Sequence, residues 1–319
     1  MADVRRAVRD SIGGRTQRGD LLLVGLSGGP DSAALAAAAA FELPRAGLRV
    51  GAIVVDHGLQ EGSDRVAGAA AELARRLGLD PVVVERVQVV GPGGPEAAAR
   101  TARHTAFDAV LDRTGAAYLM LAHTLDDQAE TVLLGLARGS GPDSLSGMDQ
   151  VSGRRLRPLL GIRRAATHAY CADAGIDAWL DPQNDDPAFR RVRVRHEVLP
   201  ILEDALGPGV AEALARTADQ LREDAGALDH LALEWAEEIS EHAEAGIALP
   251  VAALAGQPLA LLHRVIRIAV RSEFDVTLTR IQTLAVARLI TDWHGQGGVD
   301  LPGARVERSD GRLVFSANA

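Results

Sequence analysis

The sequence predicts a doubly wound α/β domain, with a parallel sheet between layers of helices, followed by a smaller, mainly helical C-terminal domain. Over the first two hundred residues, apolar runs of strand length alternate with helical segments. This order produces parallel strands joined by right-handed crossovers. Beyond about residue 205, helical segments follow one another instead. Because domains average ~150 residues, we expect the 319 residues to divide into domains at 1–205 and 206–319.

The elements of the first domain follow from the apolar runs in chain order. Residues 21–26 are continuously apolar, as expected of a strand that is buried on both faces. A glycine-rich turn and a helix at 31–43 come next. The alternation continues with strands at 48–55, 81–90 and 117–122, and with helices at 66–77, 96–113, 125–137 and 163–174.

The second domain begins with a long acidic segment. Residues 210–242 have a helical pattern, for which we expect breaks, and two further helices are predicted at 259–271 and 279–290. Residues 299–315 have the pattern of a β-hairpin region, because Pro302-Gly303 and Asp310-Gly311 are turn-forming pairs.

Composition excludes several classes of protein. No uninterrupted apolar run reaches the ~18 residues of a membrane span, and no apolar segment directly follows the N-terminal arginines as in a secretory signal. We therefore expect a cytoplasmic protein. Cys171 is the only cysteine, which excludes an internal disulfide and an all-cysteine metal site. All 34 basic residues are arginine, so cationic roles fall to guanidinium groups, whose planar fork suits phosphates.

The net charge of −9 argues at first against a nucleic-acid partner. However, residues 201–260 contain twelve acidic residues and two arginines, so the rest of the chain is close to neutral. Arginines gather within that remainder, at 154–157, 163–164 and 190–195. They predict a local basic face, although ordinary solvated surface is the alternative for each of them.

The strongest chemical signal is the loop of residues 27–32, here called the phosphate loop. It lies between the first predicted strand and the first predicted helix, an arrangement that binds phosphate. Its glycines allow backbone N–H groups to approach phosphate oxygens closely, and Asp31 is suited to hold a Mg²⁺ ion that bridges the phosphates. The alternative is a tight turn with an aspartate helix cap. The loop consists of Ser27, Gly28, Gly29, Pro30, Asp31 and Ser32.

The phosphate loop matches neither of the two commonest nucleotide loops. It lacks the Gly-x4-Gly-Lys and Gly-x-Gly-x-x-Gly patterns. It resembles the Ser-Gly-Gly-x-Asp-Ser loop of the ATP-pyrophosphatase superfamily, whose members cleave ATP between the α- and β-phosphates, adenylate a substrate oxygen and release pyrophosphate. The resemblance implies ATP and Mg²⁺ at this loop.

The second predicted strand ends in polar residues. Asp56 and His57 follow its apolar run, and the carboxyl ends of strands are where ligands bind in such sheets. Both are therefore candidates for the nucleotide pocket, although Asp56 has the alternative of capping the following turn.

A denser cluster follows the predicted strand at 117–122. His123, Asp126 and Asp127 lie between this strand and the next helix, where they are suited to hold Mg²⁺ or to orient the nucleotide base. The alternative is that Thr124 or Asp126 simply caps the helix.

Several motifs together resemble the tRNA(Ile)-lysidine synthetase family. They are the phosphate loop, the string from His123 to Arg138-Gly139-Ser140-Gly141, Arg157-Pro158-Leu159-Leu160, Asp181-Pro182-x-Asn184 and Arg195-His196-Glu197-Val198-Leu199-Pro200. The match covers about residues 20–205 and implies an adenine nucleotide alpha hydrolase-like sheet. The family adenylates C2 oxygen of the wobble cytidine in tRNA(Ile) with a CAU anticodon, and L-lysine then displaces AMP.

The resemblance also implies roles for single residues. Residues 96–104 resemble the family motif Glu-Asn-x-Ala-Arg-x-x-Arg-Tyr. Arg100 and Arg103 share a helix face, and one of them would contact the cytidine or the adenylate, with His123 near the reacting base. A solvated arginine pair is the alternative. The expected catalytic residues are therefore Asp31, Arg100, Arg103, His123 and Asp127. The sequence departs from the family at Ala97, His104 and Val192, where asparagine, tyrosine and asparagine are usual.

The same resemblance implies the partners. Phosphate contacts from the arginine-rich segment would hold the tRNA, and acidic side chains near the phosphate loop would meet the amines of lysine. A homodimer is the only oligomer that the family suggests. The arginines expected to contact tRNA are Arg190, Arg191, Arg193 and Arg195.

Two other functions stay open at this point. One is another ATP-pyrophosphatase, although a thiolation enzyme needs more cysteines than one, and amide-forming relatives usually bring a glutaminase domain for which there is no room. The other is a non-catalytic nucleotide- or tRNA-binding module, against which the intact phosphate loop argues.

Overall fold

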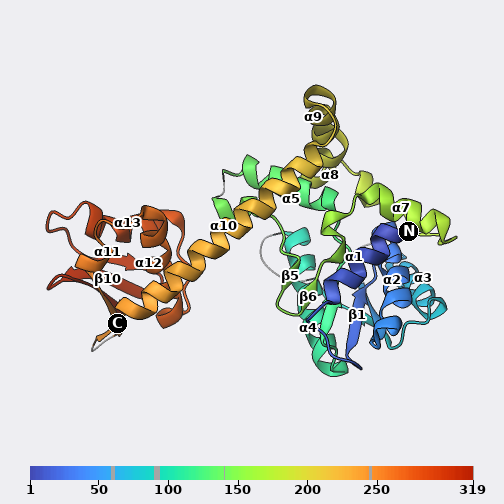
Figure 1. Ribbon diagram of the computed structural model, residues 1–319, viewed down its shortest axis with the longest axis horizontal. Helices are drawn as coiled ribbons and strands as arrows, with labels where there is room; N and C mark the ends of the chain where they lie inside the picture. The colour runs from blue at the N-terminus through green and yellow to red at the C-terminus, as the bar shows by residue number, and fades with distance from the viewer. Residues whose placement is uncertain (59–61, 90–93, 140, 244–245, 319) are drawn as a thin grey trace. The chain divides into compact units, whose positions relative to one another are not determined.

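The computed structural model describes residues 1–58, 62–89, 94–139, 141–243 and 246–318. The chain divides into two compact units, Met1–Gln220 and Leu221–Ala319 (Figure 1). Within the described residues, none of the helices has both the length and the apolar character needed to cross a membrane.

The first unit contains a six-stranded sheet with the strand order β3-β2-β1-β4-β6-β5. Its strands pair in parallel except at one edge, where β5 is antiparallel to β6. This confirms the predicted doubly wound α/β fold. The strands are β1 (Leu21–Gly25), β2 (Arg49–Asp56), β3 (Val82–Arg86), β4 (Tyr118–Met120), β5 (Val151–Ser152) and β6 (Arg155–Leu156).

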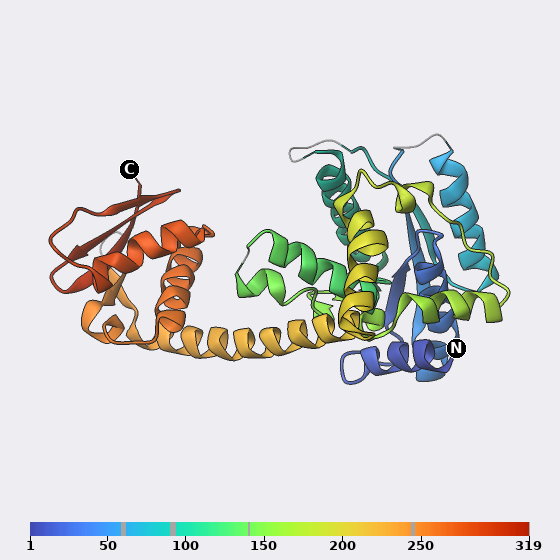
Figure 2. The same ribbon diagram turned by 90° about the horizontal axis from the view of Figure 1, so that it is seen from above.

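Helices cover both faces of this sheet because side chains alternate along each strand. Leu22 and Val24 of β1 pack into a core with α1, α2, α3 and α7, whereas Leu21 and Leu23 pack against α4 on the opposite face. Figure 2 shows the strands between α4 on one side and α3 on the other. The helices are α1 (Ala2–Ile12), α2 (Pro30–Glu42), α3 (Ser63–Arg76), α4 (Pro95–Thr114) and α7 (Arg164–Asp173).

A third group of helices packs beside the sheet. Leu125 and Ala129 of α5 form a small core with Leu199 of α9 and Ala211 of α10. The turn between α8 and α9 is π-helical (η4, Val194–Val198), a geometry that often occurs at functional sites. These helices are α5 (Leu125–Ala137), α6 (Pro142–Leu145), α8 (Arg190–Arg193), α9 (Leu199–Leu206) and α10 (Val210–Ile239).

Helix α10 runs without the breaks that we expected from the sequence. It contains no proline, and its one glycine, Gly226, is tolerated within the helix. Its start is stabilised by the carboxylate of Glu203, which accepts hydrogen bonds from the N–H groups of Gly209, Val210 and Ala211.

The second unit packs helices against a five-stranded antiparallel sheet with the order β7-β8-β11-β10-β9. The predicted hairpin is confirmed as β10 and β11, whose turn residues Asp310 and Gly311 both have positive φ angles of 48° and 74°. The remaining elements are β7 (Glu241–Ala243), β8 (Gly246–Pro250), α11 (Val251–Leu254), α12 (Leu259–Phe274), α13 (Arg280–Thr291), β9 (Val299–Leu301), β10 (Ala304–Ser309) and β11 (Arg312–Ala317).

Candidate active site

A cavity of about 840 Å³ opens at the carboxyl ends of β1, β2 and β4 in the first unit. The phosphate loop forms one wall of this cavity, the residues that follow β2 and β4 form a second, and α4 forms a third. This is the edge at which doubly wound sheets bind ligands. The polar residues that line it include Ser27, Asp31, Ser32, Asp56, His57, Arg65, Arg100, Arg103, His104, His123 and Asp181.

The phosphate loop is held in shape by its own hydrogen bonds. The Ser32 hydroxyl accepts from the N–H of Ser27 at 3.2 Å and donates to the carbonyl of Gly29 at 2.9 Å. Gly28 has a φ of 89°, a conformation that favours glycine, and its carbonyl accepts from the N–H of Trp179 at 3.0 Å. Among the described residues, α2 begins without a side-chain cap, so its first turn can offer N–H groups to an anion.

Asp31 lies at the start of α2 and lines the cavity. The Thr167 hydroxyl donates to its Oδ1, and Nε of Arg164 lies 3.4 Å from its Oδ2. Burial is the largest effect on this carboxyl, and it raises the pKa of Asp31 although both neighbours act to lower it. The charge of Arg164 therefore does not fully offset the cost of burying the Asp31 carboxylate.

The end of β2 presents two residues with different environments. Asp56 is buried, and its Oδ1 accepts from the N–H of Gly58 at 3.0 Å, so it does cap the following turn. A hydrogen bond from Ser63 is the main reason that the pKa of Asp56 is lowered. His57 lies partly buried beside it; burial lowers the pKa of His57, and the charge of Arg103 adds to the shift. The ring is therefore neutral at pH 7.

The end of β4 presents a second neutral ring. Burial lowers the pKa of His123 to about 4, although the nearby Asp127 opposes the shift. In the described part of the chain, the buried Nδ1 atoms of His57 and His123 have no hydrogen-bond partner. Two neutral rings, each with an unpaired Nδ1 atom, thus line one cavity, where they suit hydrogen bonding to a bound base.

Helix α4 contributes the cationic wall. Arg100 is exposed and Arg103 is partly buried, and burial together with the charge of Arg100 lowers the pKa of Arg103. His104 lies edge-on to Phe107, with 6.2 Å between the ring centroids. Burial lowers the pKa of His104 to about 4, and the charge of Arg100 contributes next.

Helix α5 starts with a capping box. The Thr124 hydroxyl accepts from the N–H of Asp127 at 3.3 Å, and the Asp127 carboxylate accepts from the N–H of Thr124 at 2.8 Å. Thr124 is therefore the helix cap, and Asp127 has a structural partner at its own helix end. Asp126 accepts from the N–H of Arg164 at 2.7 Å and pairs with Arg163 at 3.1 Å.

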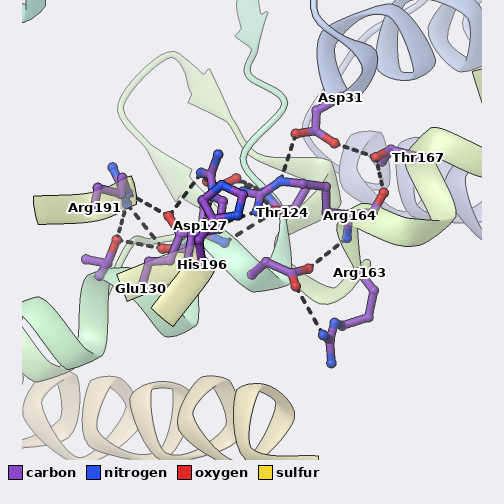
Figure 3. Close-up of polar contacts among 12 residues, drawn as sticks. Asp31, Thr124, Asp127, Glu130, Arg163, Arg164, Thr167, Arg191 and His196 are labelled. Atoms are coloured by element: carbon purple, nitrogen blue, oxygen red, sulfur yellow. Dashed lines mark hydrogen bonds and ion pairs between the residues drawn. The ribbon is translucent and has the colours of Figure 1, made fainter. Parts of the chain in front are cut away.

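A cluster of carboxylates and arginines surrounds this helix end (Figure 3). At its centre is Glu130, which is fully buried. Its carboxylate pairs with Arg195 at 2.8 Å, Arg191 at 2.9 Å and Arg164 at 3.3 Å. Arg164 also pairs with Asp127 at 2.8 Å. We call Asp31, Asp127, Glu130, Arg164, Arg191 and Arg195 the carboxylate–arginine cluster.

The predicted metal ligands divide between two environments. Asp31 lines the cavity, but Asp126 and Asp127 are not among the described residues that do so. Their carboxylates are engaged by arginines and by the helix cap. Within the described residues, no group of three or more His, Cys, Asp or Glu side chains is arranged to hold a metal ion. A metal at this site would therefore need oxygens from a bound phosphate beside Asp31.

Comparisons with known proteins decide the family. A PP-loop domain model matches residues 3–202, and a TilS substrate binding domain model matches residues 249–314. A tRNA(Ile)-lysidine synthase from Leifsonia xyli subsp. xyli is 66% identical over 298 residues, which are 93% of this chain and 90% of that protein. The synthase from Thermobifida fusca is 51% identical over 319 residues, 99% and 96% of the two chains. This chain belongs to the tRNA(Ile)-lysidine synthase family.

Membership of the lysidine synthase family makes the chain an ATP-using ligase and confirms the family resemblance of its motifs. A solved structure also shares the fold: U34-tRNA thiolase NcsA from Methanococcus maripaludis with its [4Fe-4S] cluster superposes with a TM-score of 0.60. It is 19% identical and covers 70% of this chain and 79% of its own, so the likeness concerns the fold alone.

The arginines that the lysidine synthase resemblance assigned to tRNA divide into two pairs. Arg191 and Arg195 point into the carboxylate–arginine cluster, whereas Arg190 and Arg193 are exposed and have no partner within the described ranges. Val192, where the family usually has asparagine, is buried. The side chain at Ala97, the other lost asparagine, lies outside the described residues.

Sequence reasoning missed three members of the site. Glu130, Arg164 and Thr167 were not singled out, because nothing local distinguishes a glutamate, an arginine or a threonine within a helix from a structural residue. Two features of the sequence could have indicated these residues. Glu130 lies in the same motif as His123, and Arg164 is one of two adjacent arginines. Their contact spans 34 residues of sequence, and no local pattern reveals it.

Proposed function

We propose that this chain joins L-lysine to C2 of the wobble cytidine of tRNA(Ile) with a CAU anticodon, consuming ATP and releasing AMP and pyrophosphate. The observation that supports this most is the single cavity that combines the phosphate loop with His57, His123 and the α4 arginines. Its volume of about 840 Å³ is large enough for a nucleotide and an extruded base together. The names of the relatives indicate tRNA(Ile) as the substrate and lysidine as the product.

The phosphate loop would bind the triphosphate. Its residues Ser27, Asp31 and Ser32 line the cavity at the uncapped start of α2, where the helix dipole favours anions. Asp31 would hold Mg²⁺ together with phosphate oxygens, since an oxygen donor beside a phosphate site suits this hard cation. Bound Mg²⁺ would neutralise charge on the departing pyrophosphate.

The other walls would handle the base. The cytidine O2 attacks the α-phosphorus, and the bond from the α-phosphorus to the pyrophosphate oxygen breaks. Arg100 and Arg103 line the cavity and would stabilise negative charge on the phosphoryl oxygens. The rings of His57 and His123 would hydrogen-bond the base edge. The lysine ε-amino group then attacks C2, the C2–O2 bond breaks, the oxygen leaves with AMP, and the amine loses a proton.

The tRNA body would be held by arginines outside the cavity. Arg190 and Arg193 are the exposed members of the arginine-rich segment, so we assign phosphate contacts to them rather than to Arg191 and Arg195. Replacing both with alanine should lower the salt dependence of tRNA binding by about one to two ion equivalents. The cytoplasmic location and the homodimer stay predictions, and sedimentation velocity would test the second.

The direct test is mass spectrometry of a tRNA(Ile) transcript with a CAU anticodon after incubation with ATP and lysine. We expect the wobble cytidine to gain the mass of one lysine less one water. Asp31→Asn should reduce the reaction and ATP–pyrophosphate exchange by about a hundredfold or more. The exposed Asp173→Asn variant on α7 is the matched control and should react normally. Full exchange by Asp31→Asn, or an unmodified cytidine, would refute the proposal.

A further inference from the structure

Among the side chains that the structure describes, Arg164 joins the phosphate loop to the carboxylates of α5. Its guanidinium lies 3.4 Å from Asp31, 2.8 Å from Asp127 and 3.3 Å from Glu130 (Figure 3). Its own backbone is anchored, because its N–H donates to Asp126 at 2.7 Å. The side chain is 17% exposed, so these contacts form largely out of water. The single guanidinium group of Arg164 is therefore shared by three carboxylates, which come from two segments that are distant in sequence.

The three carboxylates do not depend on Arg164 equally. Glu130 also pairs with Arg191 and Arg195, and Asp127 also lies 3.5 Å from Arg195. Among the described residues, Asp31 has Arg164 as its only arginine partner. That contact is also the longest of the three. Arg164 can thus leave Asp31 and keep two carboxylate partners.

Thr167 holds the other oxygen of Asp31. Its hydroxyl donates to Oδ1, and the side chain is fully buried. Movement of Arg164 would therefore free Oδ2 without releasing the whole carboxylate. A free, fixed carboxylate oxygen at the cavity wall is what a divalent cation requires from a single protein ligand.

We propose that Arg164 is a positioning residue that acts as the counter-ion of Asp31 until a divalent cation binds, and then shifts onto Asp127 and Glu130. This inference rests on the proposed function, because it takes Asp31 as the ligand of Mg²⁺. A guanidinium and a divalent cation repel each other too strongly to share Oδ2 at contact distance. Metal binding at the phosphate loop is consequently linked to the arrangement of the carboxylate–arginine cluster.

The test measures cation binding rather than turnover. Mn²⁺ replaces Mg²⁺ as a paramagnetic probe, and α,β-methylene-ATP supplies phosphates that cannot be cleaved at the reacting bond. Electron paramagnetic resonance of free Mn²⁺ then gives the dissociation constant for the folded protein. Arg164→Met keeps the side-chain length and removes the charge, and Arg164→Lys keeps the charge. Arg163→Met is the matched control, because Arg163 pairs with Asp126 and Glu212 but not with Asp31.

If Arg164 is the counter-ion, Arg164→Met should bind Mn²⁺ about tenfold or more tightly than the native chain, because the competing charge is gone. Arg164→Lys and Arg163→Met should stay within about threefold of it. Tighter binding should coincide with weaker ATP–pyrophosphate exchange in Arg164→Met, which a residue with a merely structural role would not produce.

Two outcomes separate this inference from the function on which it rests. Unchanged or weaker Mn²⁺ binding by folded Arg164→Met would overturn the role of Arg164, provided that Asp31→Asn loses Mn²⁺. If Asp31→Asn instead binds Mn²⁺ as the native chain does, the assignment of Asp31 fails and Arg164 has no metal with which to compete.

Discussion

Glu130→Gln is the substitution that most directly tests the carboxylate–arginine cluster. Glu130 has no exposed surface, and its two oxygens make four contacts shorter than 3.4 Å with three arginines. Glutamine has nearly the same shape, but it carries no charge and replaces one acceptor oxygen with a donor NH₂ group. That NH₂ group must then face a guanidinium, which has only donors.

The magnitude follows from burial. Removing one partner of a buried ion pair costs about 3–5 kcal/mol because the remaining charge stays desolvated. The three arginines are 17%, 36% and 22% exposed, and two of them also pair with the Asp127 carboxylate, so water and that carboxylate recover part of this cost. We therefore expect the free energy of unfolding of the first unit to fall by about 2–4 kcal/mol.

Tryptophan fluorescence during urea unfolding can report the unfolding of the first structural unit by itself. Trp179 is the only tryptophan of the first unit, and Trp235 and Trp293 belong to the second. A background with phenylalanine at both second-unit positions leaves Trp179 as the reporter. The control is Asp112→Asn, an exposed partner of Arg154, which should cost less than about 1 kcal/mol. A loss as small as the control's would show that Glu130 is not a buried counter-charge.

Three further predictions concern the surroundings of the site. Thr124→Ala removes the capping box of α5 and should cost about 1–2 kcal/mol in urea unfolding; no loss would exclude the cap. Gly51→Ala places a Cβ 2.5 Å from the Pro81 carbonyl oxygen and should lower stability by about 1–3 kcal/mol in thermal unfolding, whereas Gly68→Ala, which meets no atom within 4 Å, should not. His104 has a folded pKa of about 4, so the unfolded chain binds its proton first and stability falls as the pH drops from about 6.5 toward 4. Replacement of His104 by phenylalanine should remove about 1–2 kcal/mol of the loss between pH 7 and pH 5, and equal losses in both proteins would contradict the environment described.

Elements with strong local patterns were predicted well from the sequence. Residues 125–137 form a helix with the predicted bounds, since Thr124 supplies a cap and the apolar positions have helical spacing. The hairpin around Asp310-Gly311 also forms, because that pair accepts positive φ angles. The sequence did not predict the helices α1, α6, α8, α9 and α11 or the strands β5, β6, β7 and β8. Strands of three and five residues have too little sequence to show a period, and β8 is defined by its pairing with β11.

The candidate site divides in the same way. The phosphate loop is one continuous segment, so its glycines, hydroxyls and aspartate could be assigned from sequence. His57 and His123 could be assigned because both follow buried strands, and parallel strands end at one edge. The arginines of 190–195 could not be divided into buried and exposed pairs, because all four have the same local composition.

The amino-acid sequence by itself determined the α/β fold, the phosphate loop and the strand-end histidines, since each depends on backbone preferences and periodicity within a few neighbouring residues. Only the tertiary structure decided which charges meet. Arg164 contacts Asp31 across 133 residues, and Arg195 contacts Glu130 across 65. Electrostatic pairing depends on distance in space and on removal from water, and both are set when helices from separate parts of the chain pack together.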